Sequence, residues 1–566
     1  MLARAFRLAM PCPVRIFTVI SVLFVFTLRA FAQATPTVGL LTYDERAADG
    51  YTLFAPLTSN ITFLINNEGN LVHSWQGTAR PGNSVYFLEN GNLLRTEIVL
   101  NETMTAGGEG GKVIEQDWEG NIIWSFTYNN DKVRSHHDVE YLPNGNILMI
   151  AWEYKTYDEA IAAGRKPTML SDNELWPDHV IEVDPSTNEI VWEWHVWNHL
   201  IQDYDPTKLN YGVVADHPGL INLNYKDGVE PNTGGADWNH TNGIDYNEEF
   251  DQILLSVHGF SEIWIIDHST TTEEAAGHSG GIYGNGGDLL YRWGNPEAYD
   301  HGTANDQKLY QQHNAHWIEA GLSGEGNILI FNNGKGRLDG DYSSIEEITP
   351  PQINGAYPYT VGESYGPEGT EWNYSNPGTF FADHISGAQR QLNGNTLICE
   401  GTTGTFFEVT ENGALVWEYV NPIAQSGALT QGDTPTQNSV FRAYRYSEDY
   451  PGFAGKDLTP GNPLEIYNTT VLESGEGLPT DFVLFQNFPN PFNPSTKISF
   501  ALPNPGNVTV DIFNILGELV ENLVSDFLLA GNYIFNWNAE ELPSGIYLYS
   551  LEAAGYREIK KMTLMK

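Results

Sequence analysis

The clearest pattern along the chain is a repeated alternation of short apolar runs with turns that contain glycine and asparagine. Two versions occur: one turn leads to a run such as "NILMI", and the other leads to a run that ends in tryptophan, such as "IVWEW". Asn-Gly accepts a positive φ at both turn positions, so it favours tight hairpins. The pattern recurs at 66–75, 88–96, 117–126, 142–150, 186–194, 324–334, 392–401 and 411–419.

A hairpin pair repeated in this way predicts a β-propeller, in which sheets of four strands surround an axis. We count about six blades, with long insertions that stretch the usual repeat of about 40 to 50 residues. An array of β-sandwiches is the alternative architecture. The insertions at 200–236 and 338–380 are rich in Gly, Pro, Asn, Asp and Tyr, so we expect loops on one face. Helix is scarce, with 158–166 as one short candidate.

The N-terminal segment predicts a secretory signal peptide over residues 1–34. Arg4, Arg7 and Arg15 precede an apolar run of 13 residues at 16–28, and "RAFAQA" then offers small residues at A-x-A spacing. The run is shorter than the ~20 residues that a membrane helix needs. No later stretch is apolar enough to span a membrane, so we expect no transmembrane segment in the mature chain.

The chain after about residue 470 predicts a separate small domain of short alternating strands, which suggests an immunoglobulin-like β-sandwich. The expected fold class is thus all-β, a six-bladed β-propeller over 35–470 followed by a linker and sandwich over 471–566. The phrases "QNFPNPFNPSTKI", "DIFNILGELV", "LPSGIYLYSL" and "KKMTLMK" occur in this order. They resemble the C-terminal sorting domain of type IX secretion cargo. The resemblance implies export through the periplasm to the cell surface or medium, with the tail read by the type IX machinery.

Charge and cysteine content narrow the classes of function. Acidic residues outnumber basic ones 72 to 28, which gives a formal net charge of -44. Such a field repels nucleic acid and anionic membranes, so neither is an expected partner. An anionic substrate would need a local positive patch. Of the two cysteines, Cys12 lies in the predicted signal peptide, so Cys399 alone cannot form an internal disulfide.

Several histidines precede strand-turn phrases, and in a propeller such positions in successive blades point to the same mouth. The candidate site residues are His137, His240, His313, Arg337 and His384. His137 is preferred to His136 because Asp138 follows it. Arg337 follows a glycine-rich turn, which lets a guanidinium reach an anion bidentately. For His73, His179, His195 and His258 we favour hydrogen-bonded core positions.

No metal site or cofactor is predicted. His313 and His316 would face opposite sides of a strand, and the chain has no HExxH. The sequence leaves open whether one of the acidic loops binds a calcium ion. "GHSGG" at 277–281 fits G-x-S-x-G, but it lacks the strand before and the helix after that a nucleophile elbow needs, so it predicts a loop.

The region from about 60 to 450 resembles the aryl-sulfate sulfotransferase family. The phrases that carry the resemblance are "HHDVEYLPNGNIL", "DWNHTNGIDYN", "DQILLSVHGFSEIWIIDHSTT", "GGDLLYRWGNP", "QHNAHWI", "NILIFNNGKGR", "SGAQRQLNGNTLICEGTTGTFFEVT" and "VWEYVNP". It implies a six-bladed propeller that moves a sulfuryl group from an aryl sulfate to a phenol. The implied mechanism is ping-pong through a sulfated histidine, without a nucleotide sulfate donor.

By motif, His240, His313 and Arg337 match the family's catalytic and anion-binding positions. The nucleophile is open between His384 and His137. The alternative function is a non-catalytic propeller that binds sulfated glycans or surface partners. A quinone-dependent dehydrogenase is disfavoured, because adjacent cysteines and eight blades are not visible in the sequence.

Overall fold

The computed structural model describes residues 36–170, 172–226, 235–466, 479, 481–504, 506–528, 531–539 and 542–566. The predicted signal peptide and most of the predicted linker lie outside these residues. The described chain is all-β, as predicted, with many antiparallel sheets and little helix. In the part of the chain that is described, no helix is both long and apolar enough to cross a membrane.

Six sheets of four or five antiparallel strands make up the described chain between residues 39 and 446. The first sheet holds Val440–Tyr446 (β31), Tyr51–Pro56 (β2), Ile61–Asn66 (β3) and Leu71–Gln76 (β4); the second Pro81–Phe87 (β5), Leu93–Ile98 (β6), Gly111–Gln116 (β7) and Ile122–Thr127 (β8); the third Val133–Tyr141 (β9), Ile147–Glu153 (β10), Asp178–Asp184 (β13) and Glu189–His195 (β14). The fourth holds Thr241–Asn247 (β17), Gln252–Val257 (β18), Glu262–Asp267 (β19) and Tyr291–Trp293 (β20); the fifth His313–Trp317 (β21), Ile328–Asn332 (β22), Ser344–Ile348 (β23) and Trp372–Ser375 (β24); the sixth Gly387–Arg390 (β25), Thr396–Glu400 (β26), Thr405–Val409 (β27), Leu415–Val420 (β28) and Gly39–Tyr43 (β1).

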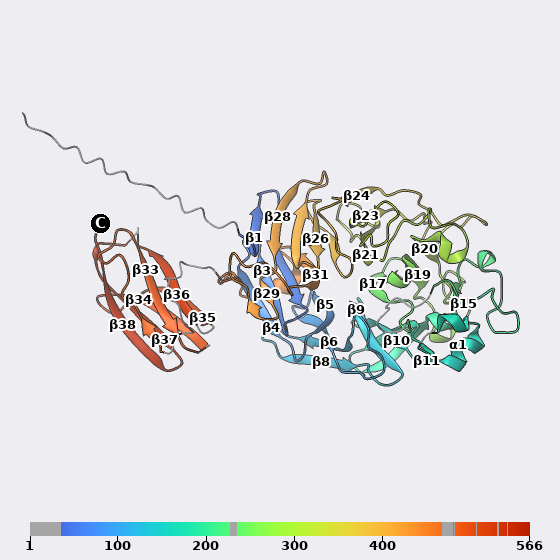
Figure 1. Ribbon diagram of the computed structural model, residues 1–566, viewed down its shortest axis with the longest axis horizontal. Helices are drawn as coiled ribbons and strands as arrows, with labels where there is room; N and C mark the ends of the chain where they lie inside the picture. The colour runs from blue at the N-terminus through green and yellow to red at the C-terminus, as the bar shows by residue number, and fades with distance from the viewer. Residues whose placement is uncertain are drawn as a thin grey trace, which may run out of the picture. The chain divides into compact units, whose positions relative to one another are not determined.

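The first strands of these sheets form a closed ring. β31 contacts β5, and β5, β9, β17, β21 and β25 then contact one another in chain order, until β25 contacts β31. In Figure 1 the sheets follow one another around a common centre in the same order. The arrangement is propeller-like. Segments from both ends of this region complete it, because β31 joins the first sheet and β1 joins the last.

The two versions of the repeated phrase occupy two different positions in the sheets. The version that continues as "NILMI" or a close variant forms the second strand, in β6, β10, β22 and β26. The version with tryptophan or a neighbouring aromatic residue forms the fourth strand, in β4, β8, β14 and β28. The second strands are buried on both faces, whereas the fourth strands carry accessible residues. The sequence difference therefore reflects distance from the centre.

Short elements fill the insertions. The helices are Tyr157–Ala163 (α1) and Thr272–Ala275 (α2), and the 3-10 turns are Pro167–Met169, Val196–Asn198, Val214–Asp216, His258–Phe260, Pro296–Tyr299 and Pro451–Phe453. The two-residue strands pair as Lys155–Thr156 (β11) with Glu174–Leu175 (β12), Leu200–Ile201 (β15) with Ile221–Asn222 (β16), and Ile423–Ala424 (β29) with Gly427–Ala428 (β30). The predicted helix at 158–166 is confirmed as α1, which begins with a capping box at Thr156 and ends at Gly164.

The prediction of a loop over 338–380 was wrong in part, because β23 and β24 lie within it. β23 has the sequence "SIEEI", in which Glu346 and Glu347 are buried. Arg390 pairs with Glu347, and Arg337 lies 3.5 Å from Glu346. The two arginines neutralise these carboxylates, so the strand can bury both charges. The local sequence of the strand did not predict this burial, because the arginines lie outside it.

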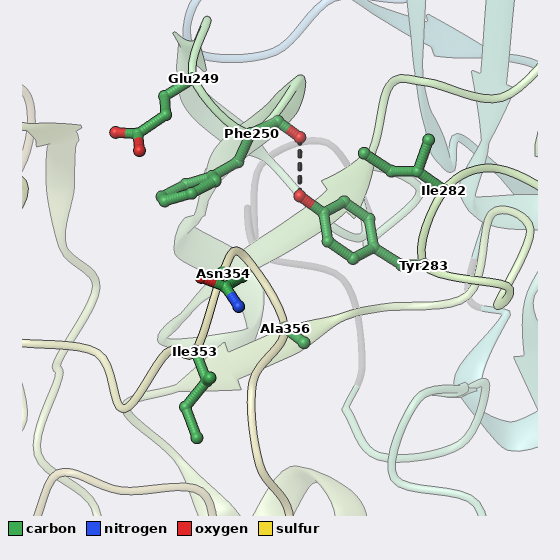
Figure 2. Close-up of a pocket in the computed structure, with 7 residues that line it drawn as sticks. All are labelled: Glu249, Phe250, Ile282, Tyr283, Ile353, Asn354 and Ala356. Carbon is green, nitrogen blue, oxygen red and sulfur yellow. Dashed lines mark hydrogen bonds between the residues drawn. The ribbon is translucent and has the colours of Figure 1, made fainter.

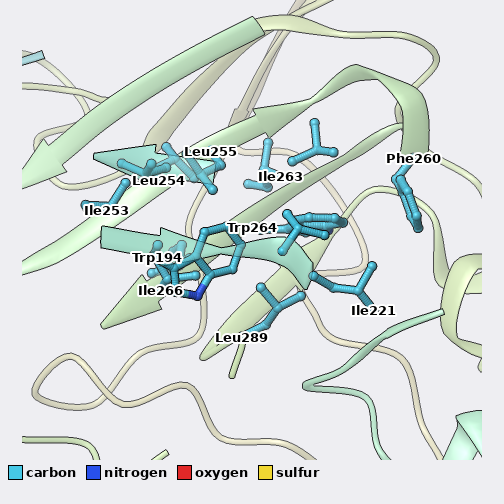
Figure 3. Close-up of a cluster of buried hydrophobic side chains, with 14 of the residues drawn as sticks. Trp194, Ile221, Ile253, Leu254, Leu255, Phe260, Ile263, Trp264, Ile266 and Leu289 are labelled. Atoms are coloured by element: carbon cyan, nitrogen blue, oxygen red, sulfur yellow. The ribbon is translucent and has the colours of Figure 1, made fainter. Parts of the chain in front are cut away.

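The largest apolar cluster lies around the third and fourth sheets. Trp194 and Trp264 pack there with Ile253, Leu255 and Ile263 (Figure 3). Each of these side chains is almost fully buried, so each gains roughly 1.5–3 kcal/mol from burial. The packing fixes the strands from which the site described below is built.

The C-terminal part forms two sheets of its own. One holds Val483–Leu484 (β32), Ser495–Leu502 (β33) and Gly531–Asn538 (β36), and the other Leu519–Leu528 (β35), Gly506–Asn514 (β34), Gly545–Ala553 (β37) and Tyr556–Leu564 (β38). Phe500 and Trp537 of the first sheet share one core with Ile512, Tyr549 and Met562 of the second. In this part of the chain two antiparallel sheets therefore pack over one core.

Candidate functional site

Five histidines gather where the first strands β9, β17 and β21 meet, and we call His136, His137, His240, His258 and His313 the histidine cluster. The ring centroids of His137 and His240 lie 4.6 Å apart, those of His240 and His258 4.9 Å, and those of His258 and His313 5.3 Å. All five are buried, with 2 to 6% of each residue exposed. The predicted convergence of His137, His240 and His313 is therefore present.

Distorted backbone brings these side chains together. His137 has a φ of 53° and His240 a φ of 51°, and Asn314, next to His313, has a φ of 50°. The pairing of β9, β17 and β21 with the next strand shifts register at the same places. A residue other than glycine in this region is uncommon and costs of order 1–3 kcal/mol. Bulges of this kind re-aim side chains beside active sites.

Hydrogen bonds to Nδ1 fix the tautomers of His240 and His313. His240 Nδ1 lies 2.5 Å from Asp237 Oδ2, and His313 Nδ1 lies 2.8 Å from Asn333 Oδ1. Both oxygens only accept, since the Asn333 amide nitrogen donates to two backbone carbonyls. Nδ1 is therefore the donor, and in the neutral ring the lone pair lies on Nε2. A carboxylate behind an imidazole also stabilises the imidazolium when it forms.

His137 is oriented by its neighbour. His136 Nε2 lies 3.3 Å from Asp178 Oδ1, and the Nδ1 atoms of His136 and His137 are 2.8 Å apart. One of these two Nδ1 atoms donates to the other, so the two rings fix each other's orientation.

Burial keeps much of the cluster neutral. It lowers the pKa of His137 and of His258 well below the ordinary imidazole value, and nearby positive groups lower both further. The pKa of His313 is also lowered well below that value by burial, although the Asn333 bond opposes the shift. These imidazoles therefore offer lone pairs rather than the cationic pocket that the net charge led us to expect.

A buried arginine ties the strands around the cluster. Arg442 on β31 lies 2.5 Å from Asp138 on β9 and donates to the carbonyl of Asn242 on β17 at 2.6 Å. Tyr86 on β5 donates to the same carboxylate at 2.6 Å. Burial opposes the charge of Arg442, but Asp138 more than offsets this and raises its pKa. One ion pair and two hydrogen bonds therefore connect four of the first strands.

The other two candidates lie apart from the five imidazoles. Arg337 donates to the Tyr342 carbonyl and to Ser344, and among the described residues no hydrogen bond or ion pair joins it to the cluster. The His384 side chain is 60% exposed, and its Nδ1 lies 2.6 Å from Asp383. Lys335 lies 3.5 Å from the same aspartate.

The exposed group of His384, Asp383 and Lys335 still influences the pKa values of the cluster electrostatically. The charge of His384 contributes to the lowered pKa of His313, and the charge of Lys335 to that of His258. The glycine-rich turn at 334–336 thus carries Lys335, whose charge acts on His258, and the predicted Arg337 follows it.

A glycine-rich loop covers two of the imidazoles. A Cβ on Gly108 would lie 2.0 Å from His137 Nε2, and a Cβ on Gly107 would lie 3.5 Å from His240 Cε1. Gly108 also has a φ of 82°, a conformation that favours glycine. The backbone at 107–108 therefore packs directly on the rings, and at position 108 only glycine leaves room for His137.

Gly108→Ala is expected to reduce activity on an aryl sulfate by about 100-fold, because the added methyl would displace His137 by an ångström or more. The control is Gly120→Ala, which has a φ of 83° and nothing within 4 Å of the new methyl. Both variants carry the backbone strain, so only Gly108→Ala should lose turnover beyond its loss of stability. Initial rates on folded protein measure the difference, and equal rates would contradict the assignment.

Sequence reasoning missed His258 and Arg442. His258 differs from the expected hydrogen-bonded core residue, because its Nδ1 has no hydrogen-bond partner among the described residues and its ring lies between His240 and His313. It directly follows the second strand β18, a position that the repeat pattern could have marked. The sequence around Arg442 contains no motif that indicates its role.

Two family models match the chain. Arylsulfotransferase (ASST) matches residues 57–448, and the secretion system C-terminal sorting domain matches residues 486–565. The sorting domain indicates export by the type IX system to the cell surface or outside, as predicted. A curated relative is arylsulfate sulfotransferase AssT of Escherichia coli, 24% identical over 415 residues, which cover 67% of this chain. The chain spans 61% of the length of that relative.

Solved structures give weaker likenesses. A protein of unknown function from Bacteroides caccae has a TM-score of 0.37 at 12% identity, covering 71% of this chain and 100% of its own. A virginiamycin B lyase from Staphylococcus aureus has a TM-score of 0.31 at 11% identity, covering 68% and 88%. At these TM-scores the likenesses carry no argument. The match to the arylsulfotransferase model covers well over half of the chain, together with the motifs that surround His240 and His313, so the chain belongs to the arylsulfotransferase family.

Proposed function

We propose that this protein is an exported sulfotransferase that moves a sulfuryl group from an aryl sulfate to a phenolic acceptor, without a nucleotide sulfate donor. The observation that carries the proposal is the cluster of five buried imidazoles, in which Asp237 and Asn333 fix the rings of His240 and His313 through their Nδ1 atoms. Membership of the arylsulfotransferase family supports the choice of substrate class.

The proposed reaction is ping-pong through a sulfated histidine. A neutral Nε2 attacks the sulfur of the aryl sulfate, an N–S bond forms, and the S–O bond to the aryl group breaks. The bound sulfate raises the pKa of the surrounding imidazoles, and the departing phenolate takes its proton from His240, whose imidazolium Asp237 stabilises. The oxygen of the second phenol then attacks the sulfur, its proton returns to the cluster, and the histidine is released.

We propose His384 as the nucleophile and His137 as the competing choice. His384 is open to solvent, and its bond to Asp383 leaves Nε2 free, whereas His137 is buried beneath the loop at 107–108. His240 and His313 would hold the sulfuryl oxygens and exchange the proton, with Asp237 stabilising the His240 imidazolium. Arg337 is retained from its motif as an anion-binding residue, with Lys335 of the same turn as a second cation.

The same proposal extends to the architecture. We propose that the six sheets are the blades of a six-bladed propeller over 35–470, supported by the closed ring of first strands. The segment 471–566 would be a linker and an immunoglobulin-like sandwich that the type IX machinery reads. Residues 1–34 would be the signal peptide.

The deciding experiment combines turnover with intact mass measurement. The full chain is incubated with a chromogenic aryl sulfate, with and without a phenol acceptor and with no nucleotide present. We expect acceptor-dependent phenol release and, without acceptor, a labile adduct of one sulfuryl group on a histidine peptide. His384→Asn and His137→Asn identify the nucleophile, and Arg337→Ala with Lys335→Ala identifies the cation. Retention on a sulfated-glycan column with neither turnover nor adduct would instead indicate a binding protein.

Sulfate should bind more tightly as the pH is lowered from 8 to 6. The free imidazoles are neutral because their pKa values are lowered, and a bound anion raises those values again. Binding then takes up a proton, so affinity should rise by up to about tenfold per pH unit. Calorimetry in buffers of different ionisation enthalpy measures both quantities. Equal sulfate affinity at pH 6 and pH 8, with no proton uptake, would contradict the proposal that neutral imidazoles become protonated when the anion binds.

A further inference from the structure

Two histidines and one aspartate form a second site outside the histidine cluster. His199, His278 and Asp288 each offer one ligand atom, and these atoms lie within 4.8 Å of one another. His199 Nδ1 lies 2.8 Å from Asp288 Oδ1, and His278 Nδ1 lies 2.7 Å from the same oxygen. His278 belongs to "GHSGG", which is the loop that its sequence predicted. No step of the proposed sulfuryl chemistry uses these residues.

The hydrogen bond on the far side of His199 determines what its near side can do. His199 Nε2 lies 2.8 Å from the carbonyl oxygen of Ala275, which only accepts, so Nε2 carries the proton. In the neutral ring, Nδ1 then directs its lone pair at a carboxylate oxygen. This contact is repulsive unless a proton or a cation lies between the two groups. A histidine that donates its other N–H to a backbone carbonyl is the usual arrangement of a metal ligand.

His199 is held rigidly in this orientation. Its side chain is fully buried, and its ring stacks on Trp194 at 5.7 Å with an interplanar angle of 6°. A Cβ on Gly287 would lie 2.6 Å from His199 Nε2, and Trp194 donates to the Gly287 carbonyl at 2.7 Å. Gly287, which directly precedes Asp288, therefore packs tightly against the His199 ring, and Asp288 faces the same ring.

We propose that His199, His278 and Asp288 bind one divalent transition-metal ion, best satisfied by Zn²⁺, with a fourth position open to water. Two imidazoles and one carboxylate are the ligand types that zinc accepts, and three protein ligands with an open position are a known zinc arrangement. Bonds of about 2.0–2.2 Å put tetrahedral ligand atoms about 3.3 Å apart. The present separations of 2.7 and 2.8 Å would widen by about half an ångström, a small movement for the exposed His278.

The ion would act as a clamp on the loop between its ligands. His278 and Asp288 stand at the two ends of that loop, and His199 comes from a distant part of the chain. Between them, Ile282 and Tyr283 line an open pocket of about 560 Å³. The Tyr283 hydroxyl donates to the carbonyl of Phe250, another residue that lines the pocket (Figure 2), and the two oxygens are 2.8 Å apart. Metal bound at the ends of the loop would fix the wall that Ile282 and Tyr283 form.

The test measures metal binding by the full chain, purified without a histidine tag and stripped with a chelator. Zn²⁺ titration by calorimetry and metal content by mass spectrometry should give one ion per chain. His278→Ala should reduce the content to near zero and weaken the affinity by more than about tenfold. His278 is exposed, so its removal should leave the fold intact. Co²⁺ in place of zinc should give visible absorption bands in the native protein and not in the variant.

The matched control is His384→Ala, because the His384 side chain is also 60% exposed and also bonded to an aspartate. That variant should still bind one ion. Limited proteolysis supplies a readout for the clamp: chelation should speed cleavage within 279–287 in the native protein but not in His278→Ala. A native chain that takes up no zinc, or a His278→Ala variant that binds it with native affinity, would overturn the proposal.

Discussion

Replacing His313 by alanine should lower kcat/KM for a chromogenic aryl sulfate by about 10² to 10⁴-fold, the range expected for loss of a group that moves a proton in the transition state. The substitution removes one Nε2 lone pair from the histidine cluster and leaves the Asn333 carbonyl without its imidazole donor. His240→Ala should have an effect of similar size, because it also leaves Asp237 buried without that partner.

Two controls separate chemistry from folding. His316→Asn changes a histidine of the same strand, β21, whose Nδ1 bonds the Asn314 carbonyl instead of joining the cluster, and it should keep turnover within about threefold. Circular dichroism should be unchanged in all three variants. If His313→Ala and His240→Ala both fold and both turn over at the native rate, the proposed catalytic role of the cluster fails.

Arg442→Met should lower the free energy of unfolding by about 3–5 kcal/mol, the usual cost of removing one partner of a buried ion pair. It leaves the Asp138 carboxylate buried with only its bonds from Tyr86 and from backbone nitrogen atoms. It also disconnects β31, the strand that closes the ring of sheets, from β9 and β17. Loss of stability should therefore be accompanied by loss of turnover.

Urea unfolding followed by fluorescence measures this effect through the shift in midpoint. The control is Arg46→Met, which removes an arginine whose side chain is 56% exposed and whose partner is Asp44. Exposed pairs contribute about 0–1 kcal/mol, so its midpoint should hardly move. A loss below about 1 kcal/mol in Arg442→Met would mean that the pair does not hold the ring together.

The local pattern predicted the strands well because each repeat contains its own turn chemistry and its own apolar run. "LPNGNILMI" specifies the turn before β10 and the strand itself, and "STNEIVWEW" specifies β14. The local pattern failed where the burial of a charged side chain depends on a partner from another part of the chain. β23 is an example, since its two glutamates are acceptable in a sheet only because Arg390 and Arg337 reach them.

The histidine site was predictable in part for the same reason. His137, His240 and His313 stand at equivalent positions of successive repeats, so circular order alone predicted that they meet. The charge state of the site was not predictable, because a pKa depends on burial and on neighbours that the local sequence does not reveal. Gly108, His258 and Arg442 were missed because their roles lie in contacts with distant residues.

By itself, the sequence determined the all-β class, the repeat, the export signal in the tail and three of the imidazoles, because turns, periodicity and motifs are local properties of the chain. The tertiary structure alone decided which strand closes the ring, that Arg442 ties the strands around the imidazoles, and that His199 meets His278 and Asp288. Those contacts join residues that are far apart in the chain, and their energies arise only when folding excludes water from between them.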